Sequence, residues 1–286
     1  ISSYPSSPAA IAGLKSLDHI VRINNHDSKG LSLKEAYSYL EGKNGSVVSL
    51  IIRRTTAFKP LEFKIKRQKF HIQSVEESVV FYDTIGYLKF ISFEKENAAI
   101  EFKQNLEALL QENIKGLIID LRYNGGGQLK HAQSIASYFI KEGPIFQIQD
   151  KNKNISIKYA TGDAFCTDIP LFILVNEGTA SSSEIVASAL QESGRATIIG
   201  SKSFGKASIQ RIYNFKDKSA LILTVSRYLS SKGKEIQGNG VSIDIKKIIP
   251  DDIKAQIESP HYIYSLENDY QLQEAVDHAL LKTRHQ

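Results

Sequence analysis

Short apolar runs alternate with segments of helical periodicity in the middle of the chain. Three runs are apolar throughout, at residues 116–119, 171–175 and 196–199. Such runs are typical of parallel strands that are buried on both faces of a sheet. Residues 98–113 carry apolar side chains at the spacing of an amphipathic helix, and residues 185–190 repeat this spacing before Gly194, a typical helix C-cap. Alternation of strand and helix through Val225 predicts parallel βαβ units and an α/β fold class.

Other elements lie on either side of this region. Strands are expected at residues 19–24, 47–54 and 79–93, the last around Gly86 and Tyr87, and helices at 32–40 and 270–282. We therefore predict three parts: an α+β module at residues 1–66, an α/β core at 67–249 and a helical tail at 250–286.

Three consecutive serines, Ser181, Ser182 and Ser183, follow the apolar run that ends at Val175. They are predicted to lie at a helix N-terminus, where unpaired backbone N–H groups and the helix dipole meet any hydroxyl. Together with Glu184 they also spell S-x-x-E, the pattern of a capping box. Taken alone, the serine cluster is explained by helix capping. The alternative is that one of these serines is a catalytic nucleophile.

A lysine occupies the next loop, in the segment S-F-G-K-A-S-I-Q that follows Gly200. Most loop lysines are solvated surface charges, but Lys206 could also serve as a base. An amine accepts a proton only when it is neutral, and burial favours the neutral form. Phe204 and the nearby strand ends are the groups expected to bury it. A serine cluster and a lysine on successive loops suggest a serine hydrolase with lysine as its base.

A glycine-rich loop, D-L-R-Y-N-G-G-G, runs from Asp120 to Gly127 directly after an apolar run. Glycines leave backbone N–H groups free to point at a developing negative charge. The alternative is an ordinary turn into the helix that begins near Gln128. Neither G-x-x-x-x-G-K-[ST] nor G-x-G-x-x-G is present, which disfavours a phosphate site.

These motifs, followed by LILTVSRYLSSKGKEIQGNG at residues 221–240, resemble in order the C-terminal processing peptidases, also called tail-specific proteases. The resemblance implies a crotonase-like or Clp-protease-like core. It assigns the nucleophile to Ser181, the general base to Lys206 and support of the lysine to Gln210. It also implies no cofactor.

The resemblance further implies that Gly126, Gly127 and Ser182 stabilise the oxyanion or bind substrate. Thr224, Arg227 and Tyr228 are expected to line or support the cleft. This chain has Ser182 where the family more often has alanine, Ala207 where it has glycine, and Gly125 where it has proline.

The segment from Ser7 to Arg54, with S-P-A-A-I-A-G-L-K-S-L-D at its start, resembles the second half of a PDZ domain. Such domains accept a peptide C-terminus as an added strand. The carboxylate-binding loop and the strand that pairs with the ligand would precede Ile1. We therefore expect a partial PDZ domain.

Composition narrows the choice of partners. The chain has 286 residues, 42% of them hydrophobic, and no apolar stretch as long as a membrane span. Its formal net charge is +5, but the basic residues are scattered, and the densest stretches, 64–69 and 151–158, lack the interleaved aromatics of a nucleic-acid surface. The seven histidines show no metal-ligand spacing, and a single Cys166 excludes an intramolecular disulfide. We predict neither nucleic-acid nor metal binding.

We therefore predict a serine endopeptidase that cleaves polypeptides near their C-termini through an acyl-enzyme. The resemblance implies action in the periplasm or cell envelope, with any membrane-associating segment lying outside this chain, and leaves the oligomeric state open. Three alternatives remain: an inactive PDZ-containing scaffold, an acyl-CoA enzyme on the same core fold, and a Ser/His/Asp triad built on His131.

Overall fold

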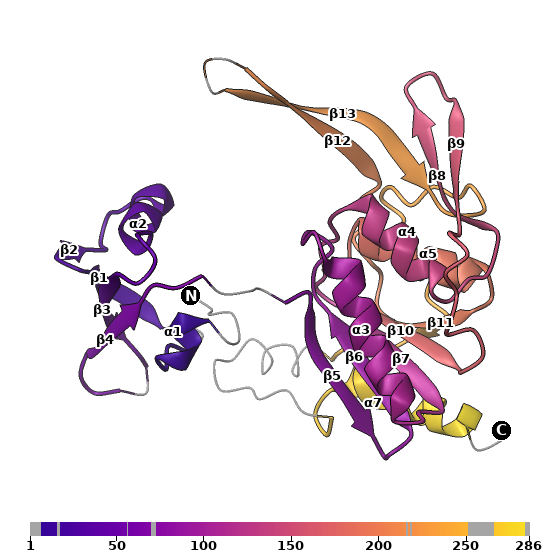
Figure 1. Cartoon of the computed structure of the whole chain (residues 1–286), viewed down its shortest axis with the longest axis horizontal. Coiled ribbons are helices and arrows are strands. Elements are labelled where there is room, and N and C mark those ends of the chain that lie inside the picture. The colour runs from indigo at the N-terminus through magenta and orange to yellow at the C-terminus, as the bar shows by residue number, and fades with distance from the viewer. Residues whose placement is uncertain are drawn as a thin grey trace. The chain divides into compact units, whose positions relative to one another are not determined.

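The computed structural model describes residues 7–15, 18–55, 57–69, 73–215, 217, 219–250 and 266–283. The chain forms two compact units (Figure 1). In the described residues, the smaller unit extends to residue 69, and the larger unit comprises 73–250 and 266–283.

The smaller unit is an antiparallel sheet with two short helices. Its strands, in the order β2-β1-β3-β4, are β1 (His19–Ile23), β2 (His26–Asp27), β3 (Val47–Arg53) and β4 (Leu61–Lys66), and its helices are α1 (Pro8–Ile11) and α2 (Leu33–Leu40). Ser32 begins α2, because its hydroxyl accepts from the Glu35 N–H while the Glu35 carboxylate accepts from the Ser32 N–H. Ile23, Leu50 and Ile52 form its buried core.

A six-stranded sheet organises the larger unit. Its order is β14-β11-β10-β7-β6-β5. The strands are β5 (Val75–Phe81), β6 (Ile85–Phe90), β7 (Gly116–Asp120), β10 (Leu171–Val175), β11 (Ala196–Gly200) and β14 (Ile245–Lys246). All neighbours pair in parallel except β5 and β6. The predicted mixed α/β class is confirmed.

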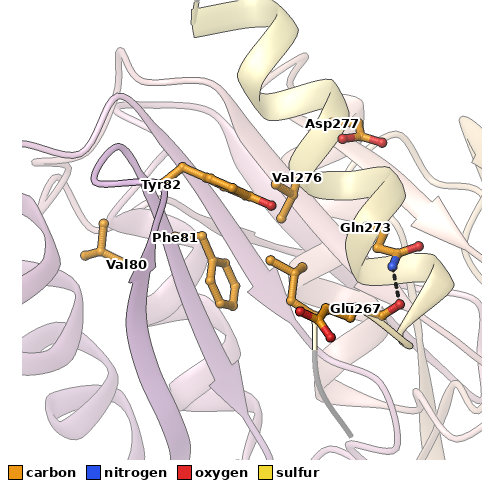
Figure 2. Close-up of a pocket in the computed structure, with 8 residues that line it drawn as sticks. Val80, Phe81, Tyr82, Glu267, Gln273, Val276 and Asp277 are labelled. Carbon is orange, nitrogen blue, oxygen red and sulfur yellow. Dashed lines mark hydrogen bonds between the residues drawn. The ribbon is translucent and has the colours of Figure 1, made fainter.

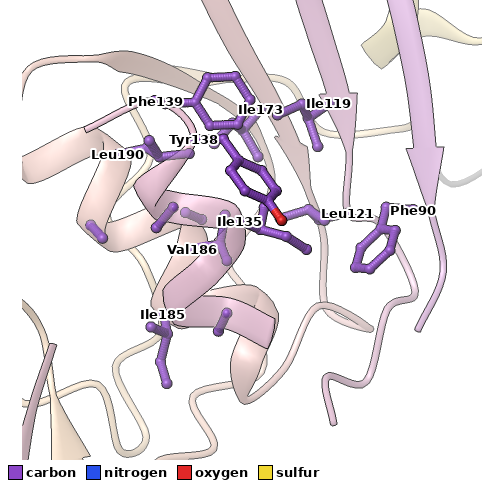
Figure 3. Close-up of a cluster of buried hydrophobic side chains, with 14 of the residues drawn as sticks. Phe90, Ile119, Leu121, Ile135, Tyr138, Phe139, Ile173, Ile185, Val186 and Leu190 are labelled. Carbon is purple, nitrogen blue, oxygen red and sulfur yellow. The ribbon is translucent and has the colours of Figure 1, made fainter. Parts of the chain in front are cut away.

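Helices cover both faces of this sheet, which explains the continuous apolar runs. On one face lie α3 (Ala98–Gln111), α4 (Leu129–Ser137) and α5 (Ser182–Glu192), and on the other lies α7 (Tyr270–Thr283). Side chains alternate along each strand, so Leu117 and Ile119 join the first core, part of which Figure 3 shows, while Ile118 joins the second. The predicted C-terminal helix is thus α7, packed on the sheet, and residues 251–265 lie outside the described residues.

A second sheet of the larger unit is antiparallel, with the order β12-β13-β8-β9. Its strands are β8 (Pro144–Asp150), β9 (Ile155–Tyr159), β12 (Ser208–Asn214) and β13 (Ala220–Leu229). The prediction of parallel units through Val225 is wrong here, because the connections from β8 to β9 and from β12 to β13 are too short for a parallel crossover. Figure 1 shows β12 and β13 as a long ribbon that extends away from the helices of this unit.

None of the helices in the described residues combines the length and apolar character that crossing a bilayer requires.

Candidate active site

Three loops meet at one edge of the six-stranded sheet. The strands β7, β10 and β11 are neighbours and run parallel, with Leu174 opposite Asp120 and Val175 opposite Gly200. The loops that leave their carboxyl ends carry the glycine motif, the serine cluster and the lysine. Loops at this edge of a parallel sheet commonly form ligand sites.

Hydrogen bonds join the serine cluster to the glycine loop. The Ala180 N–H donates to the Asn124 carbonyl at 3.0 Å, and the Ser183 hydroxyl donates to the same oxygen at 2.9 Å. The Ser182 hydroxyl donates to the Gly127 carbonyl at 2.8 Å. Two of the three serine hydroxyls are therefore buried and committed to backbone carbonyls.

Ser181 differs from its two neighbours. It is half-buried, and it has φ 58° and ψ −120° at the N-cap of α5. A residue with a side chain rarely adopts a positive φ, and such strain concentrates at functional sites. Among the described residues, its hydroxyl makes no hydrogen bond to a carbonyl of the glycine loop, unlike those of Ser182 and Ser183.

Gly126 lies directly against Ser181. A Cβ at this position, where φ is +94°, would lie 2.7 Å from Ser181 Cβ and 2.8 Å from the Ser182 nitrogen. The loop can approach the serine this closely only because residue 126 has no side chain. The Gly126 N–H donates to Asn124 Oδ1 at 2.9 Å, so this predicted oxyanion donor is engaged in the structure.

One carboxylate connects the serine cluster to the lysine loop. Glu184 is fully buried, and its Oε2 accepts from the backbone N–H groups of Ser181 and Lys206, both at 2.9 Å. Its Oε1 accepts from the Ser203 hydroxyl and the Gly205 N–H, both at 2.7 Å. An ionised carboxylate has about four acceptor positions, and all are used. The carboxylate side of the predicted capping box is thus present, and the same group also fixes the next loop.

Replacement of Glu184 tests this arrangement. In Glu184→Gln, the side-chain amide N–H₂ would face two N–H or O–H groups that now donate hydrogen bonds to the carboxylate. We expect the free energy of unfolding to fall by about 2–4 kcal/mol, as buried donors lose their acceptor. Urea denaturation of both variants measures this, with the exposed Glu107→Gln as the control that should match wild type. Equal stability of Glu184→Gln and wild type would show that the four hydrogen bonds to Glu184 do not stabilise the lysine loop.

The lysine loop is extended, and its side chains alternate between inside and outside. Ser203, Gly205 and Ala207 are buried, whereas Phe204 and Lys206 are exposed. Phe204 is 64% exposed, so the expectation that it buries Lys206 is wrong. The inward side of the loop is held by Glu184 and by Gln237 Oε1, which accepts from the Ala207 N–H at 2.9 Å.

The structure brings Ser181 and Lys206 to the same carboxylate but does not join their reactive atoms. Within the described residues, no hydrogen bond links Ser181 Oγ to Lys206 Nζ. Gln210 lies exposed in β12, opposite Thr224, and none of its side-chain atoms bonds to Lys206 within the same residues. Arg227 of β13 makes an exposed ion pair with Glu235.

A buried ion cluster holds the start of the glycine loop. Arg122 Nη2 lies 2.6 Å from Asp120 Oδ2 and 2.7 Å from Asp269 Oδ2, and the Tyr87 phenol donates to Asp120 Oδ2 at 2.8 Å. Burial alone would raise the pKa of Asp120, but the charge and hydrogen bonds of Arg122 outweigh it and lower that pKa. Sequence reasoning missed Asp269, which lies 147 residues from Arg122 and directly precedes α7.

Residues 84–247 match the model of peptidase family S41, and residues 2–54 match that of the PDZ domain. The chain belongs to peptidase family S41.

Two named relatives are processing proteases. The chain is 37% identical over 251 residues to a carboxy-terminal-processing protease of Bartonella bacilliformis, covering 86% of this chain and 57% of the relative. It is 34% identical over 252 residues to the carboxy-terminal processing protease CtpA of Bacillus subtilis, covering 88% and 53%. The chain therefore spans somewhat more than half the length of these relatives.

A solved structure supports the same family. A photosystem II D1 C-terminal processing protease superposes with a TM-score of 0.59 at 30% identity, covering 88% of this chain and 69% of the other. A putative S41 protease from Bacteroides fragilis superposes with a TM-score of 0.65 at 17% identity, covering 96% and 75%, which shows a shared fold.

Among the described residues, no hydrogen bond joins His131 to Ser181, as the His131 alternative would require. His131 lies buried on α4, and its Nε2 has no hydrogen-bond partner among the described residues. Burial, and next the charge of Lys130, lower its pKa. Without a hydrogen bond to Ser181, His131 is not arranged as the base of a triad.

Two cavities lie at different places of the S41 unit. A groove of about 480 Å³ runs over the antiparallel sheet beside the lysine loop, with Ser208, Thr224, Arg227 and Gln237 among its lining residues. A second cavity of about 460 Å³ lies between the end of β5 and α7 (Figure 2), where Phe81, Tyr82 and Val276 line it. The β5–β6 turn is at the amino ends of the parallel strands, so this cavity is at the edge opposite the three loops.

Proposed function

We propose that this chain is the peptidase part of a serine endopeptidase that cleaves polypeptides near their C-termini through an acyl-enzyme. The observation that carries the proposal is the difference among the three serines. Ser182 and Ser183 donate their hydroxyls to carbonyls of the glycine loop, whereas Ser181 is half-buried, strained and free of those carbonyls. Ser181 is therefore the hydroxyl best placed to react.

In the proposed reaction, Ser181 Oγ attacks the scissile carbonyl carbon while its proton moves to Lys206 Nζ. The tetrahedral intermediate then expels the amine of the leaving fragment, which takes the proton from Lys206. Water hydrolyses the resulting ester by the same two proton transfers, and Ser181 is restored. Gln210 would support the lysine in the complex with substrate.

The oxyanion would be stabilised by backbone N–H groups where the glycine loop meets α5. We assign the donors to Gly127 and Ser182, because the N–H groups of Gly126 and Ser181 already donate to Asn124 and Glu184. Gly126 contributes by its missing side chain, which leaves room for the loop beside Ser181. A helix N-terminus adds its dipole to this stabilisation.

Substrate itself would complete the site around Lys206. The lysine is exposed in the free chain, and a bound polypeptide would exclude water from it. The groove beside Ser208 and Gln237 offers space for such a segment next to the lysine loop.

We extend the proposal to the setting of the reaction. Relatives named carboxy-terminal processing proteases support cleavage near C-termini, and the PDZ match supports a role of the smaller unit in holding polypeptides. Action outside the cytoplasm is proposed from the family resemblance alone. An inactive scaffold is the competing function, and activity of the purified chain separates the two.

The experiment uses one folded substrate protein with a flexible tail placed at its N-terminus, at its C-terminus, or at both. Mass spectrometry of the products is expected to show cuts in the C-terminal tail and none in the N-terminal tail. A fluorophosphonate should form one adduct, on the peptide that contains Ser181. Equal cleavage of both tails would refute C-terminal processing, and absence of both cleavage and adduct would favour the scaffold.

A further inference from the structure

The groove over the antiparallel sheet lies where two hairpins of that sheet diverge. β13 pairs with β8 only from Ser226 to Leu229, with Ser226 opposite Asp150. Beyond this pair, the β8–β9 hairpin and the ribbon of β12 and β13 point apart (Figure 1). Residues 149–153 line one side of the groove and residues 224–227 line the other.

The groove also contacts the lysine loop. Ser208, the first residue of β12, is part of its lining, and so is Gln237, which accepts from the Ala207 N–H at 2.9 Å. A polypeptide in this groove would therefore lie next to the segment that carries Lys206. Its side chains there would belong to residues close to the scissile bond.

One wall of the groove is an open strand edge. On the side of β8, residues 220–225 of β13 have no pairing strand within the described part of the chain. Thr224 and Val225 of this stretch line the groove. The unpaired N–H and C=O groups of such an edge can take up an extended polypeptide as an added strand. The occupant that fits this wall is thus an extended peptide segment.

The opposite wall is positively charged. Lys151 and Lys153 lie in the turn between β8 and β9, and both are exposed, without an ion pair among the described residues. Arg227, the third cation of the lining, is paired with Glu235. Asp150 is the only carboxylate among the described lining residues.

The Asp150 carboxylate is engaged within the turn itself. Its Oδ1 accepts from the N–H groups of Asn152 and Asn154, both at 2.8 Å, and its Oδ2 accepts from the Asn154 side-chain amide at 2.9 Å. Lys153 has a φ of 66°, a backbone conformation that persists only where the surrounding structure fixes it. The turn therefore presents Lys151 and Lys153 from an ordered backbone.

We propose that this groove selects polypeptides with acidic side chains close to the scissile bond, which Lys151 and Lys153 bind while the segment pairs with the open edge of β13. The inference rests on the proposed function and names the substrate class of the same site. Two exposed ion pairs together favour an acidic segment over a neutral one by about 3- to 30-fold. Because both lysines are exposed to solvent, salt should weaken this preference.

The test compares three C-terminal tails on one folded substrate protein. They differ at two positions next to the cleavage site, which carry Asp, Asn or Lys. For wild type, we expect kcat/KM to be about 3- to 30-fold higher for the Asp tail than for the Asn tail, mainly through KM. The Lys tail should be the slowest, and an ionic strength of about 1 M should largely remove the differences.

Charge reversal locates the selecting groups. The double variant Lys151→Glu/Lys153→Glu should invert the order, so that the Lys tail becomes the fastest of the three. Lys151→Gln/Lys153→Gln should remove the preference without inverting it. The matched control is Lys115→Glu/Lys141→Glu, at two exposed lysines that are not part of the groove lining. It changes the net charge as much as the first variant does and should keep the wild-type order.

Equal cleavage of the Asp and Asn tails by wild type would overturn the inference, while the proposed function would stand because both tails are cut. A preference that survives charge reversal at Lys151 and Lys153, or that the control loses equally, would also overturn it, since the selecting charges would lie elsewhere. If wild type forms no product from any tail, the proposed function fails, and the inference falls with it.

Discussion

Ser181→Ala is expected to lower kcat/KM for a tailed polypeptide by about 10⁴-fold or more, as loss of the nucleophile does in serine hydrolases that act through an acyl-enzyme. The variant removes only one oxygen, and the backbone N–H of residue 181 keeps its acceptor on Glu184. Folding should therefore be preserved. A continuous assay of the fluorescent C-terminal fragment measures the loss, and circular dichroism verifies the fold.

The control for this substitution lies on the same helix. Ser188 is buried in α5, and its hydroxyl donates to the Ile185 carbonyl. Ser188→Ala therefore removes one hydroxyl oxygen of α5 away from the three loops and should retain the wild-type kcat/KM. Proteolysis by Ser181→Ala at a rate within tenfold of wild type would exclude Ser181 as the nucleophile.

Lys206→Arg is expected to lower kcat by about 10²- to 10⁴-fold, the usual contribution of a general base. Arginine keeps the positive charge and the long side chain, but it does not release its proton at any working pH and cannot accept one from Ser181. The backbone of residue 206 should stay in place, because its N–H donates to Glu184 and its carbonyl accepts from Tyr228. Single-turnover measurement of acylation reports the loss at the chemical step.

Two further variants serve as controls for Lys206→Arg. Lys206→Ala should lose as much activity as Lys206→Arg if proton transfer is the function of the lysine. If Lys206→Arg keeps most of the activity and Lys206→Ala loses it, the lysine acts by its charge, and a different base must be found. Lys232→Ala, at an exposed lysine of the turn after β13, should be fully active.

Local patterns predicted the three central strands of the six-stranded sheet, β7, β10 and β11. The run at residues 171–175 is apolar throughout because α5 and α7 cover the two faces of β10, and buried strands of this kind are visible in any sequence. Because neighbouring parallel strands end at one edge, the two successive loops that carry Ser181 and Lys206 lie at the same edge of the sheet.

The antiparallel sheet was not predicted, for a physical reason. Ile212, Ile222 and Leu223 of the ribbon are apolar yet exposed, so their pattern marks no buried face. A strand of this kind is identified by its pairing partner, and pairing is not visible in one sequence.

Glu184 shows a second limit of local reasoning. Its spacing from Ser181 predicted a cap, which is a contact over three residues. Its other donors, among them Gly205 and Lys206, lie on the next loop, and only the parallel register of β10 and β11 brings them to the same carboxylate. The phenol of Tyr228 reaches the Lys206 carbonyl for a similar reason, from a strand of the other sheet.

The pairing of Arg122 with Asp269 determines when, during translation, the glycine loop can gain its full set of buried ion pairs. Arg122 is buried beside the glycine loop, and its second carboxylate is 147 residues further along the chain. A buried charge that lacks part of its neutralising partners is strongly destabilising. During translation, the loop therefore gains its full support only after Asp269 has been synthesised, long after Ser181 and Lys206. Ser181 and Lys206 both precede Asp269 in the chain, so the loops that carry them are complete before this ion pair can form.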